Sequence, residues 1–254
     1  MESVVKFCRR LLVACAASVP CFAAAQTVLG SACATFPGVY VQQQTVTLNH
    51  SAAAGQLIVV GVAVNAPAQL ADANPVSDSA GNGYPISNAV TLYGNSGVLF
   101  AFAGRAAAAL NAGGSITIGY FSTGSTTAQS CVEAVAFPGV SVANPDDAYG
   151  AGYGTGNSLM VTASTSTQHS NELVYSVFAS AGTPGAVAAL APAQGVGGTC
   201  SGDGTLCLLP AWNLGAASAG IYEGADASSA NSVGWGALLI TFQSNDRIFA
   251  NGFE

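Results

Sequence analysis

Apolar and polar residues alternate in short runs along most of the chain. These runs are rich in β-branched residues and are separated by Gly, Pro and Asn, which is typical of β-strands joined by turns. We expect strands at residues 40–48, 57–64, 84–92, 98–103, 115–121, 131–137, 159–164, 172–179, 186–190, 219–222 and 233–242. The pattern therefore predicts an all-β chain of about eleven strands.

Two of the expected strands are almost continuously apolar. Residues 57–64 read Leu-Ile-Val-Val-Gly-Val-Ala-Val, and residues 172–179 read Glu-Leu-Val-Tyr-Ser-Val-Phe-Ala. Strands that are covered on both faces have this composition, so both are expected in the interior. A Gly-rich link is expected at residues 149–156. We therefore expect a single antiparallel β-sandwich, of the jelly-roll or immunoglobulin-like kind, at residues 26–243.

The first 25 residues have the layout of a secretory signal peptide. Basic residues precede a short apolar run at residues 11–19, and the three alanines that end at Ala25 offer a small-residue cleavage site before Gln26. The alternative is a lipoprotein signal cut before Cys15, but only four apolar residues separate that cysteine from Arg10. We therefore expect residues 1–25 to be removed and the mature chain to be exported to the periplasm, the cell surface or the extracellular space.

Charge narrows the class of partner. The leader takes three of the five basic residues, which leaves Arg105 and Arg247 as the only cations of the expected mature chain. A surface with so few cations cannot neutralise a phosphate backbone, so nucleic acid is excluded as a partner. Mean hydropathy is high at +0.46, yet no apolar run in the expected mature chain reaches the length of about 18 residues that a membrane-spanning helix needs.

Four of the seven cysteines lie in the expected mature chain: Cys33, Cys131, Cys200 and Cys207. An even number in an exported chain indicates disulfide bonds. Cys200 and Cys207 bracket a turn-rich segment and are expected to close one loop. Cys33 would then join the N-terminal strand to the central strand that carries Cys131. A zinc site is the alternative, but the Cys-x6-Cys spacing is wider than the usual close pair, and no histidine is nearby in the sequence.

Several segments, taken in order, resemble those of a class of bacterial secreted β-sandwich domains. They start at Gly55 (Gly-Gln-Leu-Ile-Val-Val), Val76 (Val-Ser-Asp-Ser-Ala-Gly-Asn-Gly-Tyr) and Val132 (Val-Glu-Ala-Val-Ala-Phe-Pro-Gly). The class typically reads G-D-L, then V-x-D-S-x-G-N-x-Y, then E-Y-S-G. Here Gln56 replaces the usual Asp, and Ala134 follows the Glu in place of Tyr. The resemblance implies the fold and the export, and it implies no reaction because the class has no general activity.

The end of the chain carries a second resemblance. Residues 246–254 read Asp-Arg-Ile-Phe-Ala-Asn-Gly-Phe-Glu, which is similar to a D-x-I-F-x-x-G-F-E ending on exported proteins of some Gram-negative bacteria. The resemblance implies a sorting or processing signal within residues 244–254. An ordinary frayed terminus is the alternative.

A candidate ligand-binding segment covers residues 199–213. A disulfide would preorganise this segment as a loop, and loops on a rigid scaffold commonly carry binding residues. Trp212, Asn213 and Asp203 are therefore the expected ligand contacts, with Trp212 as an aromatic platform for a sugar. Trp235 lies in the last expected strand and is expected in the core.

Acidic residues suggest two further kinds of chemistry. Glu133 would need a second carboxylate, from Glu172 or Glu223, to act as a glycosidase. Asp78 and Asn82 could supply oxygen ligands to Ca²⁺, although the same segment reads as a turn in which the Asp side chain caps its own backbone. No other metal site and no cofactor are expected.

Together these patterns predict a secreted, non-catalytic surface or extracellular module that serves adhesion or contact with a matrix. Its partner outside the cell would be another macromolecule or a glycan. A carbohydrate-binding module is the alternative, and a glycoside hydrolase or other secreted hydrolase is the second alternative. No nucleophile motif, phosphate-binding loop or histidine-centred catalytic group is visible in the sequence, which favours a protein that is not an enzyme.

Overall fold

The computed structural model describes residues 26–37, 42–70, 74–123, 127–140, 148–163, 166–169, 172–190, 194–214, 220 and 227–243. The expected signal peptide at residues 1–25 and the expected tail at 244–254 lie outside this part of the chain. Glu223 and most of the expected strand at 219–222 lie outside it as well.

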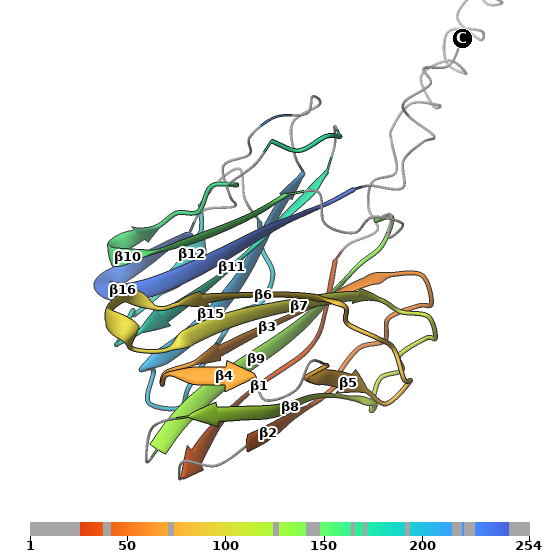
Figure 1. Cartoon of the computed structure of the whole chain (residues 1–254), viewed down its shortest axis with the longest axis horizontal. Helices are drawn as coiled ribbons and strands as arrows, with labels where there is room; N and C mark the ends of the chain where they lie inside the picture. Colours follow the sequence, from red (N-terminus) through yellow and green to blue (C-terminus); the bar gives the residue numbers. More distant parts are fainter. Residues whose placement is uncertain are drawn as a thin grey trace, which may run out of the picture.

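The described residues form strands and one short 3-10 turn, which confirms the all-β prediction. Every strand pairing is antiparallel, and the strands build three sheets that lie one above another (Figure 1). The middle sheet has the order β1-β9-β3-β7-β6. Its strands are β1 (Thr27–Pro37), β9 (Thr127–Phe137), β3 (Leu57–Val64), β7 (Val98–Arg105) and β6 (Ile86–Thr91). The 3-10 turn η1 (Tyr93–Asn95) joins β6 to β7.

The other two sheets cover the two faces of the middle sheet. The large sheet has the order β10-β16-β11-β15-β13, with β12 beside β16 and β14 beside β15. Its strands are β10 (Tyr149–Leu159), β16 (Ala227–Phe242), β11 (Leu173–Ala181), β15 (Leu206–Leu214), β13 (Gln194–Gly195), β12 (Val187–Ala189) and β14 (Thr199–Cys200). The small sheet consists of β2 (Gln42–Thr47), β8 (Ser115–Thr123), β4 (Ala68–Leu70) and β5 (Val76–Asp78).

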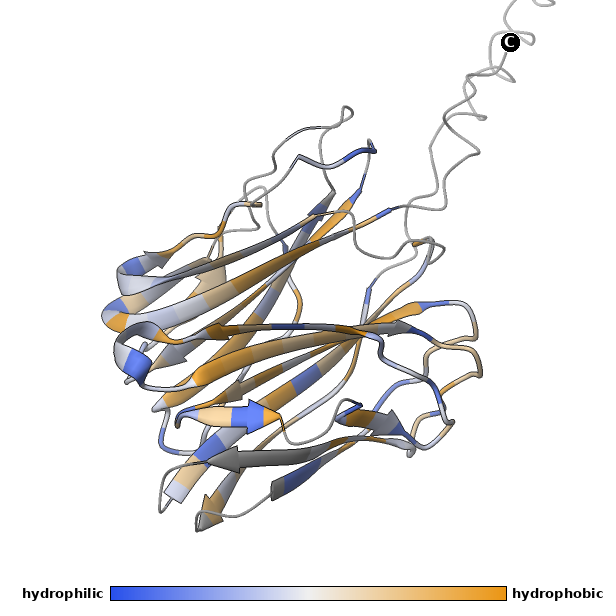
Figure 2. Cartoon of the chain, in the orientation of Figure 1, coloured by the Kyte–Doolittle hydropathy of each residue, from blue (hydrophilic) through white to orange (hydrophobic). Residues whose placement is uncertain are grey.

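Strand β3 shows why the middle sheet is apolar on both faces. Ile58 and Val60 join the core shared with the small sheet, whereas Leu57 and Val59 join the core shared with the large sheet. All eight residues of β3 are buried, and β11 is buried along nearly its whole length. The prediction that both apolar runs are interior strands is therefore confirmed. Figure 2 shows apolar residues along the strands that face these cores.

The Gly-rich residues 149–156 are not a link, and that expectation is wrong. They form most of β10, the edge strand of the large sheet, paired with β16. A side chain at Gly150 would overlap the carbonyl oxygen of Thr162, and a Cβ at Gly154 would lie 2.9 Å from the Trp235 ring. Alternate glycines therefore leave room for the chain that returns over β10 and for the indole. The expected strand at 159–164 is also wrong, because Leu159 ends β10.

Strand β15 is also missing from the expected set. Pro210 lies inside it and has no N–H to donate, which is why proline counts against a strand in the sequence pattern. The register places Pro210 opposite Val177 of β11, and its carbonyl accepts a hydrogen bond of 3.0 Å from the Val196 N–H. The strand therefore forms despite the proline, with neighbours on both sides.

The alternate glycines of β10 can be tested by substitution. Gly150→Ala places a methyl group against the Thr162 backbone, so we expect a loss of about 1–3 kcal/mol in the free energy of unfolding. Gly83→Ala is the control, because a Cβ at Gly83 has no atom within 4 Å, and it should change stability by less than about 0.5 kcal/mol. Urea denaturation measures both, and equal effects would contradict the packing described for β10.

Candidate functional site

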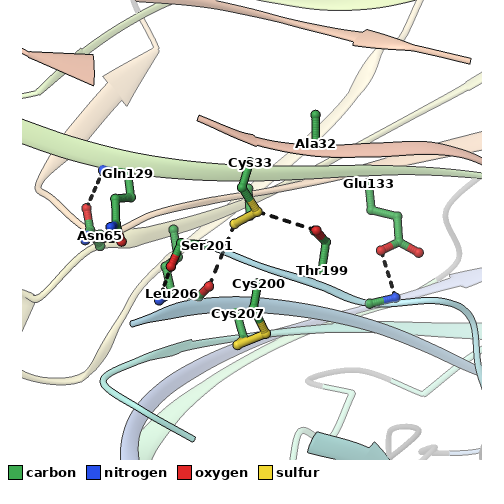
Figure 3. The surroundings of a disulfide bond; sticks show 12 residues. Ala32, Cys33, Asn65, Gln129, Glu133, Thr199, Cys200, Ser201, Leu206 and Cys207 are labelled. Carbon is green, nitrogen blue, oxygen red and sulfur yellow. Dashed lines mark hydrogen bonds between the residues drawn. A yellow bond between two sulfur atoms is a disulfide. The ribbon is translucent and has the colours of Figure 1, made fainter. Parts of the chain in front are cut away.

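The predicted disulfide pairs are both present. Cys33 bonds to Cys131 across the neighbouring strands β1 and β9, and Cys200 bonds to Cys207 across β14 and β15. Figure 3 shows that the two bonds lie close together, one in each sheet. The segment at 199–213 is consequently a β-hairpin with its turn at residues 201–205, so the expectation of a loop that ends in Trp212 is wrong.

Trp212 lies on β15 and points into the space between the middle and large sheets. Its ring packs edge-on against Phe137, with ring centroids 6.3 Å apart, and it borders the core that contains Tyr175. Its Nε1 is buried and has no hydrogen-bond partner among the described residues. Trp212 and Asn213 are partly buried rather than fully exposed. Their expected contact with a ligand stays a prediction. Trp235 is buried at the outer face of the large sheet.

Asp203 is the centre of a polar network at the hairpin turn. Its Oδ1 accepts hydrogen bonds from the Ser201 hydroxyl at 2.6 Å and the Thr205 N–H at 3.1 Å. Its Oδ2 accepts one from Gln129 Nε2 of the middle sheet at 2.7 Å. These bonds, that from Ser201 foremost, hold the pKa of the Asp203 carboxyl well below its usual range. Asp203 is therefore ionised at neutral pH and joins the two sheets.

Asp78 and Asn82, the candidate Ca²⁺ ligands, bond to each other and to their own turn. Asp78 Oδ1 accepts from the N–H groups of Ala80 and Asn82, and its Oδ2 accepts from Asn82 Nδ2 and the Tyr84 hydroxyl. Asn82 also exchanges two hydrogen bonds with the Ala108 backbone. The V-x-D-S-x-G-N-x-Y pattern thus has a structural explanation. Its Asp, Asn and Tyr bond to one another, and its Asn also bonds to the Ala108 backbone. Within the described residues, no group of three or more His, Cys, Asp and Glu residues could hold a metal ion.

Glu133 is a carboxylate buried between the middle and large sheets. Its side chain is 0% exposed, and its Oε2 accepts a 2.9 Å hydrogen bond from the Gly198 N–H. Its Oε1 is buried without a partner among the described residues. Burial raises the pKa of Glu133 to about 7, although the Gly198 bond acts in the opposite direction. Burial, and then the charge of Glu133, raise the pKa of Tyr175.

The backbone beside Glu133 is shaped by two glycines. Gly197 and Gly198 both have positive φ, and a side chain at Gly197 would overlap Glu133 Oε1. Only glycine permits this close approach of the loop to the carboxylate. Glu172, the second carboxylate considered for catalysis, is also 0% exposed, with His169 Nδ1 at 3.7 Å. Neither carboxylate is therefore open to a substrate in this conformation.

The exposed aromatic side chains gather on β10 instead. Tyr149 and Tyr153 are 54% and 65% exposed, and they lie on the same face of the strand with Ala151 between them. Successive strand residues rise by about 3.3 Å, so the two tyrosines are about 13 Å apart. Sequence reasoning missed them because the glycines hid the period-two pattern.

Tyr93 completes this exposed face. Its side chain is 47% exposed. Gly234 of β16 is paired with Thr155 of β10, and a Cβ at Gly234 would lie 3.7 Å from the Cβ of Tyr93. The turn η1 contacts both β10 and β16. We name Tyr93, Tyr149 and Tyr153 the tyrosine face. Strands β6, β10 and β16 and turn η1, which surround it, carry no charged residue.

A second surface feature is an open groove of about 350 Å³ between β4, β6 and β7. Apolar side chains, including Leu70, Val98 and Phe100, line most of it, and Gln69 and Thr91 add polar groups. The strand β4 that borders the groove is only three residues long.

Comparison with known proteins returned no match: no protein-family model, no curated protein and no solved structure is significantly similar to this chain. Among the described residues, no helix is long and apolar enough to cross a membrane.

The two disulfides should differ in what they contribute to stability. In the chain-entropy model, a bond that closes a longer loop stabilises more. Removing Cys33–Cys131, with a sequence separation of 98, should lower the free energy of unfolding by about 4–5 kcal/mol. Removing Cys200–Cys207, with a separation of 7, should lower it by about 2–3 kcal/mol and leave the domain folded. Denaturation of the two double Cys→Ser variants measures this, and a reversed order would contradict it.

Glu133 should make stability depend on pH. Its pKa rises from 4.5 to about 7 on folding, so the folded state binds the proton more tightly than the unfolded state. The free energy of unfolding should therefore fall as pH rises from about 4.5 to 7 and then level off. Glu133→Gln lacks this fall. As pH rises from 4.5 to 8, its free energy of unfolding should therefore increase by about 3 kcal/mol relative to that of the wild type.

The other titrating groups are present in both the wild type and Glu133→Gln. Their contributions to the pH dependence of stability therefore cancel when the two proteins are compared. Denaturant titrations at closely spaced pH values give the two curves. If the free energies of unfolding of the two proteins change in parallel between pH 4.5 and 8, the pKa of Glu133 is not raised by folding.

Proposed function

We propose that this protein is an exported, non-catalytic binding module that contacts a neutral glycan outside the cell. The observation that carries the proposal is the tyrosine face on the edge of a disulfide-bonded scaffold. The two disulfides favour an oxidising compartment, and the leader expected at residues 1–25 supplies the route of export. The resemblance to bacterial secreted β-sandwich domains supports the same location.

The spacing of the tyrosines favours an extended ligand. A sugar ring presents an apolar C–H face that stacks on an aromatic ring. Tyr149 and Tyr153 are separated by about 13 Å, the length of a short oligosaccharide, and Ala151 leaves the strand flat between them. A rigid strand also holds the rings in place before binding, which lowers the entropy cost of binding.

Charge favours a neutral ligand over an anionic one. The strands around the tyrosine face carry no charged residue, and the chain has a net charge of −7. An acidic protein without a local cation repels anionic polymers and anionic membranes. A neutral glycan has no such penalty. The hydrolase alternative receives no comparable support, because Glu133 and Glu172 are both fully buried.

Substitution of the tyrosine face tests the proposal. Tyr149→Ala and Tyr153→Ala should each weaken binding to a neutral oligosaccharide at least tenfold, or about 1.4 kcal/mol, because each removes one stacking surface. The melting temperature should change little, since both side chains are exposed. A glycan array identifies the oligosaccharide, and titration calorimetry measures the affinity.

Two further variants make the test specific. Met160→Ala is the matched control, because Met160 is 53% exposed and lies over Gly152, on the side of β10 away from the tyrosines; its affinity should equal that of the wild type. Trp212→Phe should also retain binding. Loss of binding in Trp212→Phe alone would place the ligand at the hairpin, and no binding to any neutral glycan would overturn the proposal.

A further inference from the structure

A cluster of four polar side chains joins the middle and large sheets on the side of the sandwich away from β10. Gln129, Asp203 and Thr205 form a closed ring of hydrogen bonds, and Asn65 bonds to Gln129. Gln129 lies on β9 of the middle sheet and Asn65 directly follows β3, whereas Asp203 and Thr205 come from the turn of the β14–β15 hairpin. The Thr205 hydroxyl oxygen lies 2.8 Å from both Gln129 Oε1 and Asp203 Oδ1. We propose that Thr205 and Gln129 form an intramolecular ester bond that covalently links the two sheets.

Gln129 is held and polarised as an electrophile should be. Asn65 accepts a 2.7 Å hydrogen bond from the Gln129 backbone N–H and donates its own backbone N–H to the Gln129 carbonyl at 3.1 Å. Its Nδ2 donates to Gln129 Oε1 at 3.1 Å. This last bond points at the oxygen on which negative charge would develop during attack on the amide, which is the role of an oxyanion donor.

Thr205 and Asp203 supply the nucleophile and the proton acceptor. One oxygen of the Asp203 carboxylate faces the Thr205 hydroxyl, and the other accepts from Gln129 Nε2 at 2.7 Å. The same carboxylate therefore contacts both the proton that must leave and the nitrogen that must receive it. A hydroxyl with an adjacent base and a fixed acceptor carbonyl has the arrangement of nucleophilic acyl transfer.

The step balances without any further reactant. Thr205 Oγ1 attacks Gln129 Cδ and forms the new C–O bond, while its proton passes to Asp203. The C–N bond of the amide then breaks, the nitrogen takes the proton from Asp203, and ammonia leaves. A carbonyl carbon lies about 1.2 Å from its oxygen, so Oγ1 is within about 4 Å of Cδ and close to attack distance.

The structure contains a second cluster of an amide and a carboxylate, and it differs from the Gln129 cluster in the position of its hydroxyl. Asn82 and Asp78 are also hydrogen bonded, but the hydroxyl in that cluster, Tyr84, bonds only to the carboxylate. The Asn82 carbonyl oxygen accepts from the Ala108 N–H rather than facing a nucleophile. Among these two clusters, only that of Gln129 places an aliphatic hydroxyl against the amide carbonyl.

The proposed bond would extend the covalent network of the two disulfides. Gln129 lies two positions before Cys131, and Thr205 lies two positions before Cys207. Figure 3 shows Gln129 and Asn65 beside the cysteines of both sheets. The disulfides each act within a sheet, whereas the ester would join one sheet to the other. Such a link resists separation of the sheets under force, which suits a module exposed outside the cell.

Peptide mapping by mass spectrometry tests the proposal on the folded, exported protein. Chymotryptic digestion under reducing conditions should yield one linked peptide pair that contains Gln129 and Thr205 and weighs about 17 Da less than the two peptides together, the mass of ammonia. Hydroxylamine should separate the pair. The peptide pair, and not the intact mass, decides the result, because an N-terminal Gln26 can also lose ammonia by cyclising.

Variants assign the roles. Thr205→Val should abolish the linked pair, and Asp203→Asn should slow its formation at least tenfold. Thr45→Val is the control, since the Thr45 hydroxyl contacts only another hydroxyl, that of Thr117, in the bonds described, and it should leave the pair intact. Each variant is first shown to retain the Cys200–Cys207 bond and a cooperative thermal transition.

Recovery of separate, unmodified Gln129 and Thr205 peptides from the wild type would overturn the proposal. Recovery of glutamate at position 129 without a linked pair would overturn it as well, because the ester would then not persist. A linked pair that survives in Thr205→Val would assign the cross-link to another residue and would equally reject Thr205 as the nucleophile.

Discussion

Burial of the middle sheet on both faces is the constraint on which the rest of the structure depends. A strand such as β3, with all eight residues buried, can be stable only between two apolar layers, because its exposed apolar surface would be too costly in water. The large and small sheets provide these layers. The close approach of the sheets also explains glycines such as Gly61 of β3, where a Cβ would lie 3.0 Å from Val177 of the large sheet.

Polar groups inside this arrangement are few and specific. Glu133 lies between the sheets because the Gly197–Gly198 backbone approaches it closely enough to donate a hydrogen bond. One of its oxygens lacks a partner in the described residues, so the site carries a cost in desolvation that the surrounding packing offsets. Asp203, at the margin of the same space, is instead fully hydrogen bonded and ionised. Burial and hydrogen bonding thus shift the pKa values of two carboxylates in opposite directions.

The two proposals use opposite sides of the molecule. The tyrosine face lies on the free edge of the large sheet, where β10 leaves its aromatic side chains in solvent. The cluster of Asn65, Gln129, Asp203 and Thr205 lies on the other side, where the hairpin turn meets β9. A binding face at one edge and covalent links at the other are compatible, because neither set of residues contacts the other. A mechanically rigid scaffold would keep the exposed tyrosines in a fixed arrangement.

The sequence by itself determined the all-β class, the two interior strands and the disulfide pairs. These features depend on local patterns, namely runs of apolar residues and the spacing of cysteines around a turn. It also indicated the turn of Asp78 and Asn82, because the bonds that Asp78 accepts come from nearby residues, Ala80, Asn82 and Tyr84. The third sheet, the identity of β10 as a strand and the inward position of Trp212 were decided only by the tertiary structure.

The physical reason is that these features depend on partners distant in the sequence. A glycine at position 150 signals flexibility locally, yet here it makes room for Thr162 and for a packed edge strand. The direction of the Trp212 ring follows from the register of β15 on β11, which no local pattern encodes. The contact between Gln129 and Thr205 likewise spans 76 residues, and only the packing of one sheet on another brings the two side chains together.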